Sequence, residues 1–141
     1  MRCLGCHLAN QKEPAYIVFE DDFVCCILDH EPYNDGHVLI LPKKHIRYID
    51  ELDETAGHSL LAAAATISKA IKILFAPDGI SVIQNGGDFD EMTHFHMHVV
   101  PRYKNQNFAE FYLDNQHNEA VDEKKLEEIS RDLIEVITKL S

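Results

Sequence analysis

The sequence predicts an α+β protein in which a five-stranded, mostly antiparallel sheet carries a central helix and a C-terminal helix. Three observations predict this class: short apolar runs that end in turn residues, one long helical repeat rich in alanine, and an amphipathic repeat near the C-terminus. The 141 residues, 45% of them hydrophobic, suit one compact domain. We expect a single domain over residues 1–141, with a core over residues 1–103 and a tail and helix over residues 104–141.

The strands are expected where apolar runs meet turn chemistry. Residues 16–20 and 23–28 are such runs, separated by two aspartates, as is typical of a hairpin. The third strand, residues 37–41, follows an Asn-Asp-Gly turn segment and ends at Pro42. The remaining two strands are expected over residues 80–84 and 94–100.

Two helices are expected from apolar side chains at helical spacing. The first starts near Asp53 and ends at the Pro-Asp-Gly segment of residues 77–79, whereas the second starts at Asp122, a good N-cap residue. Their apolar positions are Leu60, Ala64, Ile67, Ile71 and Leu74 in the first helix, and Leu126, Ile129, Leu133, Val136 and Leu140 in the second. Between the last strand and the last helix, residues 102–120 are polar and irregular.

Charge and hydropathy exclude several classes of partner. A net charge of −11 repels nucleic acid polymers and anionic membranes, although a small phosphate ester can still bind where the site supplies donors. The chain has no run of 18 apolar residues, so we expect no membrane span. Its N-terminus has no apolar segment of the signal-peptide kind, and we expect a cytoplasmic protein.

Three histidines alternate with apolar residues at His94, His96 and His98, within the last predicted strand. Side chains at alternate strand positions share a face, so Phe95 and its neighbours can face a core while the imidazoles lie opposite. Such imidazoles suggest chemistry at a phosphate or a metal. At about 3.3 Å per residue, His94 and His98 lie roughly 13 Å apart, so one ion cannot collect all three rings.

Cys3 and Cys6 form a C-x-x-C motif, which indicates a metal half-site or a redox pair. With His45 and one histidine of the trio they would complete a tetrahedral Cys₂His₂ zinc site of the structural kind. The alternative is a solvated N-terminus with two free thiols. Adjacent Cys25 and Cys26 lie in an apolar strand and are expected to be reduced core residues.

The histidines outside such a metal site suit phosphoryl or nucleotidyl transfer. A neutral imidazole is a good nucleophile when one ring nitrogen is free and the other donates a hydrogen bond. A neighbouring imidazolium can stabilise charge on the phosphate oxygens.

The run from His94 to Pro101 resembles the signature of the histidine triad (HIT) family of nucleotide hydrolases and transferases. Further segments resemble the family in the same order over about residues 3–103, above all residues 36–45, which end in Pro-Lys-Lys-His. The resemblance implies that His96 attacks the α-phosphate and forms a nucleotidyl-histidine, which water then cleaves. It implies that His98 and His37 orient or protonate groups around that phosphate.

The resemblance also implies the binding residues and the assembly. Asp29 would accept from the ribose hydroxyls, and Asn85 would help to hold the phosphate. The base pocket would be walled by Leu8, Ile27, Leu28 and His30, and a structural zinc would be held by Cys3, Cys6, His45 and His94, as in the zinc-containing bacterial branch. The expected partners are a small nucleotide, either a nucleoside phosphoramidate or a dinucleoside polyphosphate, and a second copy of the chain in a homodimer with joined sheets.

One segment departs from the family pattern. The family has a loop that ends in Gly-Gln followed by a hydroxyl residue. In this chain Glu91 falls at the position of that hydroxyl, and a carboxylate beside a polyphosphate repels it. This departure favours one alternative, a nucleotide-binding protein with little turnover. A second alternative is a zinc-dependent lyase or hydrolase that uses the His-x-His pair as metal ligands.

Overall fold

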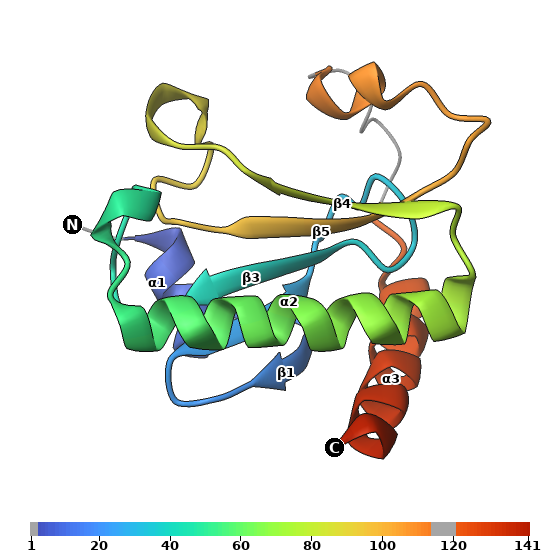
Figure 1. Cartoon of the computed structure of the whole chain (residues 1–141), viewed down its shortest axis with the longest axis horizontal. Coiled ribbons are helices and arrows are strands. Elements are labelled where there is room, and N and C mark those ends of the chain that lie inside the picture. Colours follow the sequence, from blue (N-terminus) through green and yellow to red (C-terminus); the bar gives the residue numbers. More distant parts are fainter. Residues whose placement is uncertain (1–2, 114–120) are drawn as a thin grey trace.

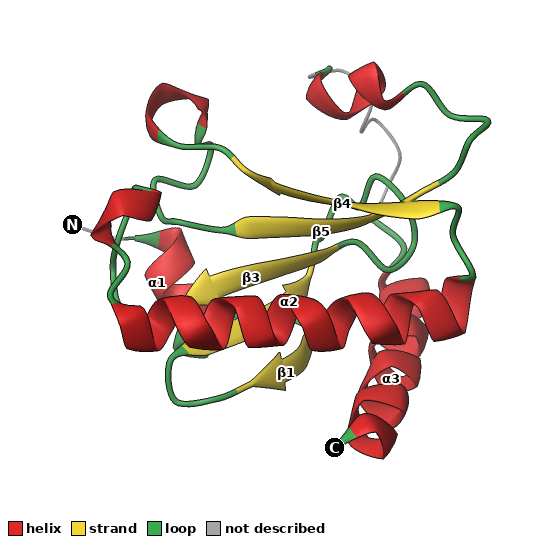
Figure 2. Ribbon diagram, viewed as in Figure 1, coloured by secondary structure: helices red, strands yellow, loops and turns green. Residues whose placement is uncertain are grey.

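The strands form one open antiparallel sheet in the order β1-β2-β3-β5-β4 (Figures 1 and 2). This architecture comes from a computed structural model that describes residues 3–113 and 121–141. The strands are β1 (Ile17–Glu20), β2 (Val24–Leu28), β3 (Val38–Pro42), β4 (Gly79–Gln84) and β5 (Met97–Arg102). The predicted fold class is confirmed, and every strand pair in the described residues is antiparallel.

Both predicted helices begin at their predicted caps. In α2 (Glu54–Phe75) the Asp53 side chain accepts a hydrogen bond from Ala56 N at 2.8 Å, which satisfies a donor that the helix leaves free. In α3 (Glu123–Leu140) the Asp122 side chain accepts from Lys125 N at 3.0 Å. The two aspartates that the sequence offers as N-caps therefore do cap these helices.

The main core lies between the sheet and these two helices. α2 crosses one face of the sheet, and α3 packs against α2 and β1 (Figure 1). Phe95, Met97 and Val99 face this core, as their alternation predicts. By length and composition α2 could cross a membrane, but its side chains at Leu60 and Ile67 are buried against the sheet, as in a core helix.

A short helix, α1 (Leu4–Ala9), covers part of the opposite face and was not predicted. It packs on β2 and β3, where Ile27 and Leu41 belong to a second, smaller apolar cluster. At Gly5, α1 lies so close to the segment that carries His94 that a Cβ added to Gly5 would lie 2.3 Å from the Cβ of His94. Only glycine fits at this position, so Gly5 brings the N-terminal segment against the histidine run.

The last strand starts at Met97 rather than at residue 94, so the prediction for residues 94–96 is wrong. The β3–β5 register pairs Ile40 with Met97, and its continuation would place Phe95 opposite Pro42, which has no N–H to donate. The N–H of Phe95 instead donates to Ile46 O at 2.8 Å. The first histidine of the trio therefore leaves the sheet and separates from the other two.

Three short 3₁₀ helices complete the described residues: η1 (Ile49–Glu51), η2 (Gly87–Phe89) and η3 (Phe108–Tyr112). The third lies in the segment that was predicted to be irregular. Residues 114–120 of that prediction lie outside the described residues.

Candidate active site and metal centre

The sheet face opposite α2 brings the predicted polar residues together. Alternation places the side chains of Ile27, Leu39 and His98 in one row on this face, because Ile27 pairs with Leu39 and Leu39 pairs with His98. Beyond this row, Asp29 follows the end of β2 and His37 precedes the start of β3. The N–H of Asp29 donates to the carbonyl of His37 at 3.0 Å. Three strands therefore deliver an aspartate and two histidines to one place.

His37 is held in a single tautomer by a backbone donor. The N–H of Tyr33 donates to Nδ1 of His37 at 3.0 Å, so the ring proton lies on Nε2. That Nε2–H lies 2.9 Å from Nδ1 of His98 and 3.4 Å from a carboxylate oxygen of Asp29. The neutral His37 ring is 2% exposed, and it acts as a donor toward its neighbour.

His98 must accept this hydrogen bond at Nδ1, and its own ring proton therefore lies on Nε2. Burial and, after it, the adjacent His37 and His96 rings together lower the pKa of His98 to about 3. His98 is thus a neutral hydrogen-bond donor toward the cavity.

His96 has the opposite polarity. Its Nδ1 lies 2.9 Å from the carbonyl oxygen of His94, which can only accept, so Nδ1 carries the proton and Nε2 carries the lone pair. The His96 and His98 rings meet edge to face with centroids 5.0 Å apart. One imidazole with a free lone pair therefore lies beside another with a free N–H.

A buried carboxylate that the sequence reasoning missed lies behind His96. Oδ1 of Asp90 is 3.5 Å from Nδ1 of His96, and the Asp90 side chain is fully buried. The same oxygen accepts from the N–H groups of Met92 and Thr93 at 2.8 and 3.1 Å, which holds Thr93 at a left-handed φ of 54°. The Asp90 carboxylate thus stabilises a turn and also places a negative charge beside His96. The sequence contains no sign of this role, because Asp90 lies in an irregular loop without periodicity.

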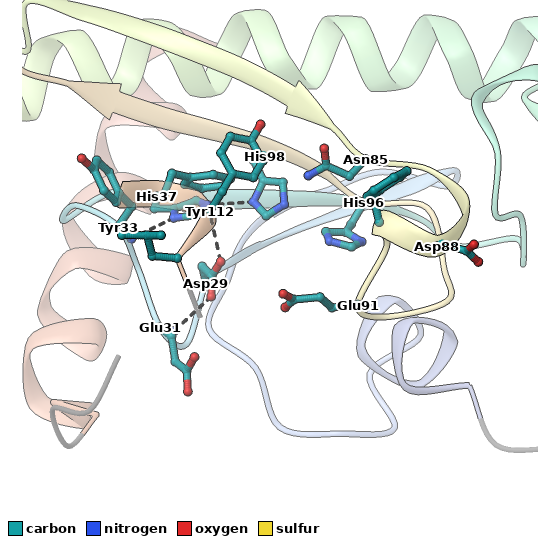
Figure 3. Close-up of a pocket in the computed structure, with 13 residues that line it drawn as sticks. Asp29, Glu31, Tyr33, His37, Asn85, Asp88, Glu91, His96, His98 and Tyr112 are labelled. Carbon is teal, nitrogen blue, oxygen red and sulfur yellow. Dashed lines mark hydrogen bonds and ion pairs between the residues drawn. The ribbon is translucent and has the colours of Figure 1, made fainter. Parts of the chain in front are cut away.

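These groups line a cavity of about 590 Å³ (Figure 3). Its floor contains His37, His96 and His98, and Asp29 and Asn85 reach it from the ends of β2 and β4. The rest of its lining consists of acidic and aromatic side chains and one leucine: Glu31, Tyr33, Asp88, Phe89, Glu91, Phe111, Tyr112 and Leu113. Figure 3 shows the Glu91 carboxylate extending into the space between Asp29 and His96.

An aromatic wall from η3 closes one side of the cavity and was also not predicted. Phe111 meets His98 edge to face, with ring centroids 5.2 Å apart, and stacks on Phe108 at 5.1 Å. The guanidinium of Arg102 lies 3.8 Å above the Phe108 ring, which anchors the segment to the end of β5. The signal in the sequence was Phe-x-x-Phe-Tyr at residues 108–112 within a polar stretch.

Cys3, Cys6, His45 and His94 form a second cluster, at the N-terminus of α1. Nδ1 of His94 lies 3.5 Å from Cys3 Sγ, 3.4 Å from Cys6 Sγ and 3.4 Å from His45 Nδ1. Four ligands around zinc, with bonds of about 2.1–2.3 Å, are spaced by roughly 3.4–3.8 Å, which these separations approach. The donor set and its spacing therefore fit a tetrahedral ion.

The surroundings of this cluster support that fit. His94 is fully buried, and its Nε2 lies 2.8 Å from the carbonyl oxygen of Pro42, so Nε2 carries the proton and Nδ1 is free to ligate. Burial lowers the pKa of His94, which keeps the ring neutral. Burial and the neighbouring Cys3 thiol raise the pKa of Cys6 to about 11, so two adjacent thiolates need a cation between them.

The four residues predicted for the base pocket do not all lie on one side of the sheet. Leu8 and Ile27 pack in the apolar cluster on the cavity side of the sheet, whereas Leu28 faces the core under α2. The exposed His30 ring lies 3.2 Å from a carboxylate oxygen of Glu123. None of these four is among the described residues that line the cavity.

Fold and site together define an α+β protein with an open five-stranded sheet and a histidine-lined cavity. Residues 10–105 match the model of the HIT domain. The chain belongs to the HIT domain family, as its histidine run predicts.

Relatives of this chain carry the same domain. An uncharacterized HIT-like protein of Borreliella burgdorferi is 34% identical over 132 residues, which cover 91% of this chain and 93% of that protein. An adenylylsulfatase of Arabidopsis thaliana is 30% identical over 102 residues, which cover 71% of this chain and 52% of that protein. The family thus includes a hydrolase.

Solved structures show the same fold over almost the whole chain. A histidine triad nucleotide-binding protein from Sulfolobus tokodaii superposes with a TM-score of 0.83 at 26% identity, covering 98% of this chain and 93% of that chain. A zinc-bound histidine triad protein from Mycobacterium smegmatis has a TM-score of 0.79 at 26% identity, covering 99% of this chain and 96% of that chain.

Proposed function

We propose that the protein transfers or hydrolyses a nucleotide at its α-phosphate through a covalent nucleotidyl-histidine on His96. The observation that carries this proposal is the tautomer of His96, whose Nδ1–H is held by the carbonyl of His94 while Nε2 is available to the cavity. The substrate class is a nucleoside phosphoramidate or a dinucleoside polyphosphate. Membership of a family that includes an adenylylsulfatase supports chemistry at a nucleotide phosphate.

The proposed reaction has two displacements. Nε2 of His96 attacks the α-phosphorus, and the bond from phosphorus to the leaving group breaks with its electron pair on the leaving group. Water then attacks the same phosphorus and releases a proton to solvent, the bond to His96 breaks, and the nitrogen recovers its lone pair. Throughout, the Nε2–H of His98 donates to a phosphate oxygen, and His37 holds His98 in that tautomer.

The remaining residues of the site would bind the nucleoside and the phosphate. Asp29 accepts from the ribose hydroxyls, and Asn85 contacts the phosphate from the end of β4; both line the cavity. Leu8 and Ile27 lie on the cavity side of the sheet, but Ile27 is only 3% exposed, so their place in the base pocket stays a prediction. For Leu28 and His30, the role in the base pocket stays a prediction from the family resemblance.

We further propose that Cys3, Cys6, His45 and His94 hold one structural zinc ion. Four protein ligands leave no open position for a substrate, so the ion would stabilise the fold rather than react. It would tie α1 to the loop that carries His94, two residues from the proposed nucleophile. The zinc-bound relative from Mycobacterium smegmatis supports this assignment.

The direct test is replacement of the nucleophile. His96→Ala should abolish release of the nucleoside monophosphate, by at least about 10⁴-fold, because no other group can form the intermediate. Nucleotide binding and the melting temperature should stay close to those of the wild type. His58→Ala is the matched control, because His58 is exposed on α2 and should leave turnover unchanged. Full turnover by His96→Ala would reject the covalent route.

One observation favours a second candidate, a zinc-dependent lyase or hydrolase. The ligand atoms of Asp29, His37 and His98 all lie within 4.8 Å of one another, although this group contains a carboxylate in place of His96. A catalytic ion there predicts that a chelator stops turnover at once while the fold persists. The covalent route predicts that the turnover rate is unchanged just after a chelator is added.

The expected homodimer and cytoplasmic location are part of this proposal. β4 is an edge strand, and its Val82 side chain is 50% exposed, so this edge can join the sheet of a second copy. A monomer in analytical ultracentrifugation at micromolar concentration would contradict the dimer. A reducing compartment such as the cytoplasm keeps Cys3 and Cys6 as thiols able to bind zinc.

A further inference from the structure

The cavity around His96 and His98 has an unusual charge balance for a site that handles phosphates. Among the described residues that line it there is no lysine or arginine, whereas four residues contribute carboxylates: Asp29, Glu31, Asp88 and Glu91. The nearby cations are engaged elsewhere. Arg47 donates to Gly87 O at 3.0 Å, and Arg102 donates to Ser81 Oγ at 2.7 Å and stacks on a phenylalanine.

Glu91 is the carboxylate best placed to act on the leaving group. It lines the cavity, and its carboxylate extends into the space beside His96 in Figure 3. A negative charge at such a position repels a leaving group that departs with several negative charges. It attracts a leaving group that gains positive charge as its bond to phosphorus breaks.

The aromatic wall gives an independent indication of what the leaving group is. Tyr112 and Leu113 line the cavity and are 58% and 53% exposed, and Phe89 lines it from η2 and is 81% exposed. Phe111 carries this apolar surface up to the ring of His98. Apolar side chains offer no hydrogen bonds to a polyphosphate chain, but they do bury an apolar body.

We propose that Glu91 selects the leaving group by charge, so that the site releases an amine with an apolar body in preference to a polyphosphate. This inference rests on the proposed function and names its leaving group. The scissile bond is then the bond from the α-phosphorus to a nitrogen. The leaving nitrogen takes a proton from solvent and carries positive charge as Nε2 of His96 bonds to phosphorus. It then keeps the electron pair of the broken bond and departs as an amine, which a second proton converts to an ammonium ion.

The electrostatic consequence of this step differs between the two substrate classes. Protonation of the leaving nitrogen creates positive charge beside Glu91, which the carboxylate stabilises as the bond breaks. A tetraphosphate ester instead leaves with negative charge in the same place. Removing the Glu91 charge should therefore slow the first reaction and speed the second, a reversal that loss of stability alone cannot produce.

The experiment compares two adenylate donors that share the attacked phosphorus. One is adenosine 5′-monophosphate joined through nitrogen to phenylethylamine, and the other is diadenosine tetraphosphate. Their kcat/KM values are measured for the wild type, for the isosteric variant Glu91→Gln, and for Glu128→Gln as a matched control. Glu128 is exposed on α3 and does not line the cavity.

The wild type should favour the phosphoramidate, and Glu91→Gln should shift the ratio of the two kcat/KM values toward the tetraphosphate by about tenfold. Glu128→Gln should leave the ratio unchanged. An unchanged ratio in Glu91→Gln, with both substrates turned over, would overturn the selection and leave the proposed function intact. Absence of any adduct on wild-type His96 with either donor would overturn both.

Discussion

At the residue scale, the chemistry depends on which nitrogen of each ring carries its proton. Backbone groups fix that choice: the carbonyl of His94 holds the proton of His96 on Nδ1, and the N–H of Tyr33 holds that of His37 on Nε2. The neighbouring rings of His96 and His98 thereby present an Nε2 lone pair and an Nε2–H to the same cavity. In the proposed reaction His96 would act as the nucleophile and His98 as a hydrogen-bond donor to the phosphate. Two residues of the same type thus differ in role because their hydrogen-bonding partners differ.

Asp90 should support the charge that His96 gains as it bonds to phosphorus. Asp90→Asn keeps an oxygen for the N–H groups of Met92 and Thr93 but removes the negative charge 3.5 Å from Nδ1 of His96. A charge-assisted contact of about 1.5–3 kcal/mol predicts a fall in kcat of roughly 10- to 100-fold, with KM changed much less. Steady-state kinetics check this, and an unchanged kcat would contradict it.

His98 should make stability depend on pH. Its pKa is about 3 in the folded protein against 6.5 for a free histidine, so between these values the unfolded chain binds a proton that the native state does not. The free energy of unfolding should therefore fall as the pH drops below about 6.5, with His98 contributing at most about 1.4 kcal/mol per pH unit.

The measurement is urea unfolding at about pH 7 and about pH 5 for the wild type and for His98→Asn. The variant lacks the titrating ring, so its stability should fall less between the two conditions. Equal losses in both proteins would show that His98 does not carry this dependence.

Sequence reasoning identified the histidines and Asp29 because their spacing and the family resemblance point to chemistry. The structure brings Asp29, His37, His96 and His98 to one cavity. Asp90 was missed because its importance arises from a contact behind His96, which no periodicity reveals.

At the element scale, Pro42 separates the two functions of the histidine run. Pro42 has no N–H and cannot continue the β3–β5 ladder, so residues 94–96 leave the sheet. The carbonyl of Pro42 instead accepts a hydrogen bond from Nε2 of His94. His94 thus turns toward the cysteines of α1 while His96 and His98 stay at the cavity. The expected strand over residues 94–100 failed at this point because the ladder partner has no N–H.

The zinc proposal makes a prediction for α1. We expect about one zinc ion per chain in protein purified under reducing conditions, and Cys3→Ser should lose most of it and lower Tm by at least about 4 °C. Elemental analysis and thermal unfolding measure both effects.

Cys25→Ala is the control, because Cys25 is a buried thiol in β2 and lies outside the ligand cluster. It should keep its zinc even if it loses some stability. Wild-type protein without zinc would remove the proposed site.

The longer elements could be predicted from sequence because capping and periodicity agree, as at Asp53 and Asp122. α1 has only six residues and contains a glycine, and η3 is a single short turn, so neither has a readable period. Both are held by tertiary contacts instead, α1 against His94 and η3 by its stacked aromatic rings.

At the scale of the whole molecule, the sheet separates stability from chemistry. α2 and α3 cover one face and bury the main core, which leaves the other face to α1 and the cavity (Figure 1). In β5 the alternation sends Met97 and Val99 to the core and His98 to the cavity. We expect a net charge of −11 to repel polymers of phosphate, whereas the proposed site would receive a single nucleotide on its imidazole floor.

The most direct measurement is the mass of the intact protein after rapid acid-free denaturation during turnover, followed by mapping of the modified peptide. The wild type should carry one nucleoside monophosphate on His96, bonded through nitrogen and therefore lost in acid but stable in base. His96→Asn should carry none. A nucleotide on another residue, or substrate turnover with no adduct at any time, would contradict the covalent route through His96.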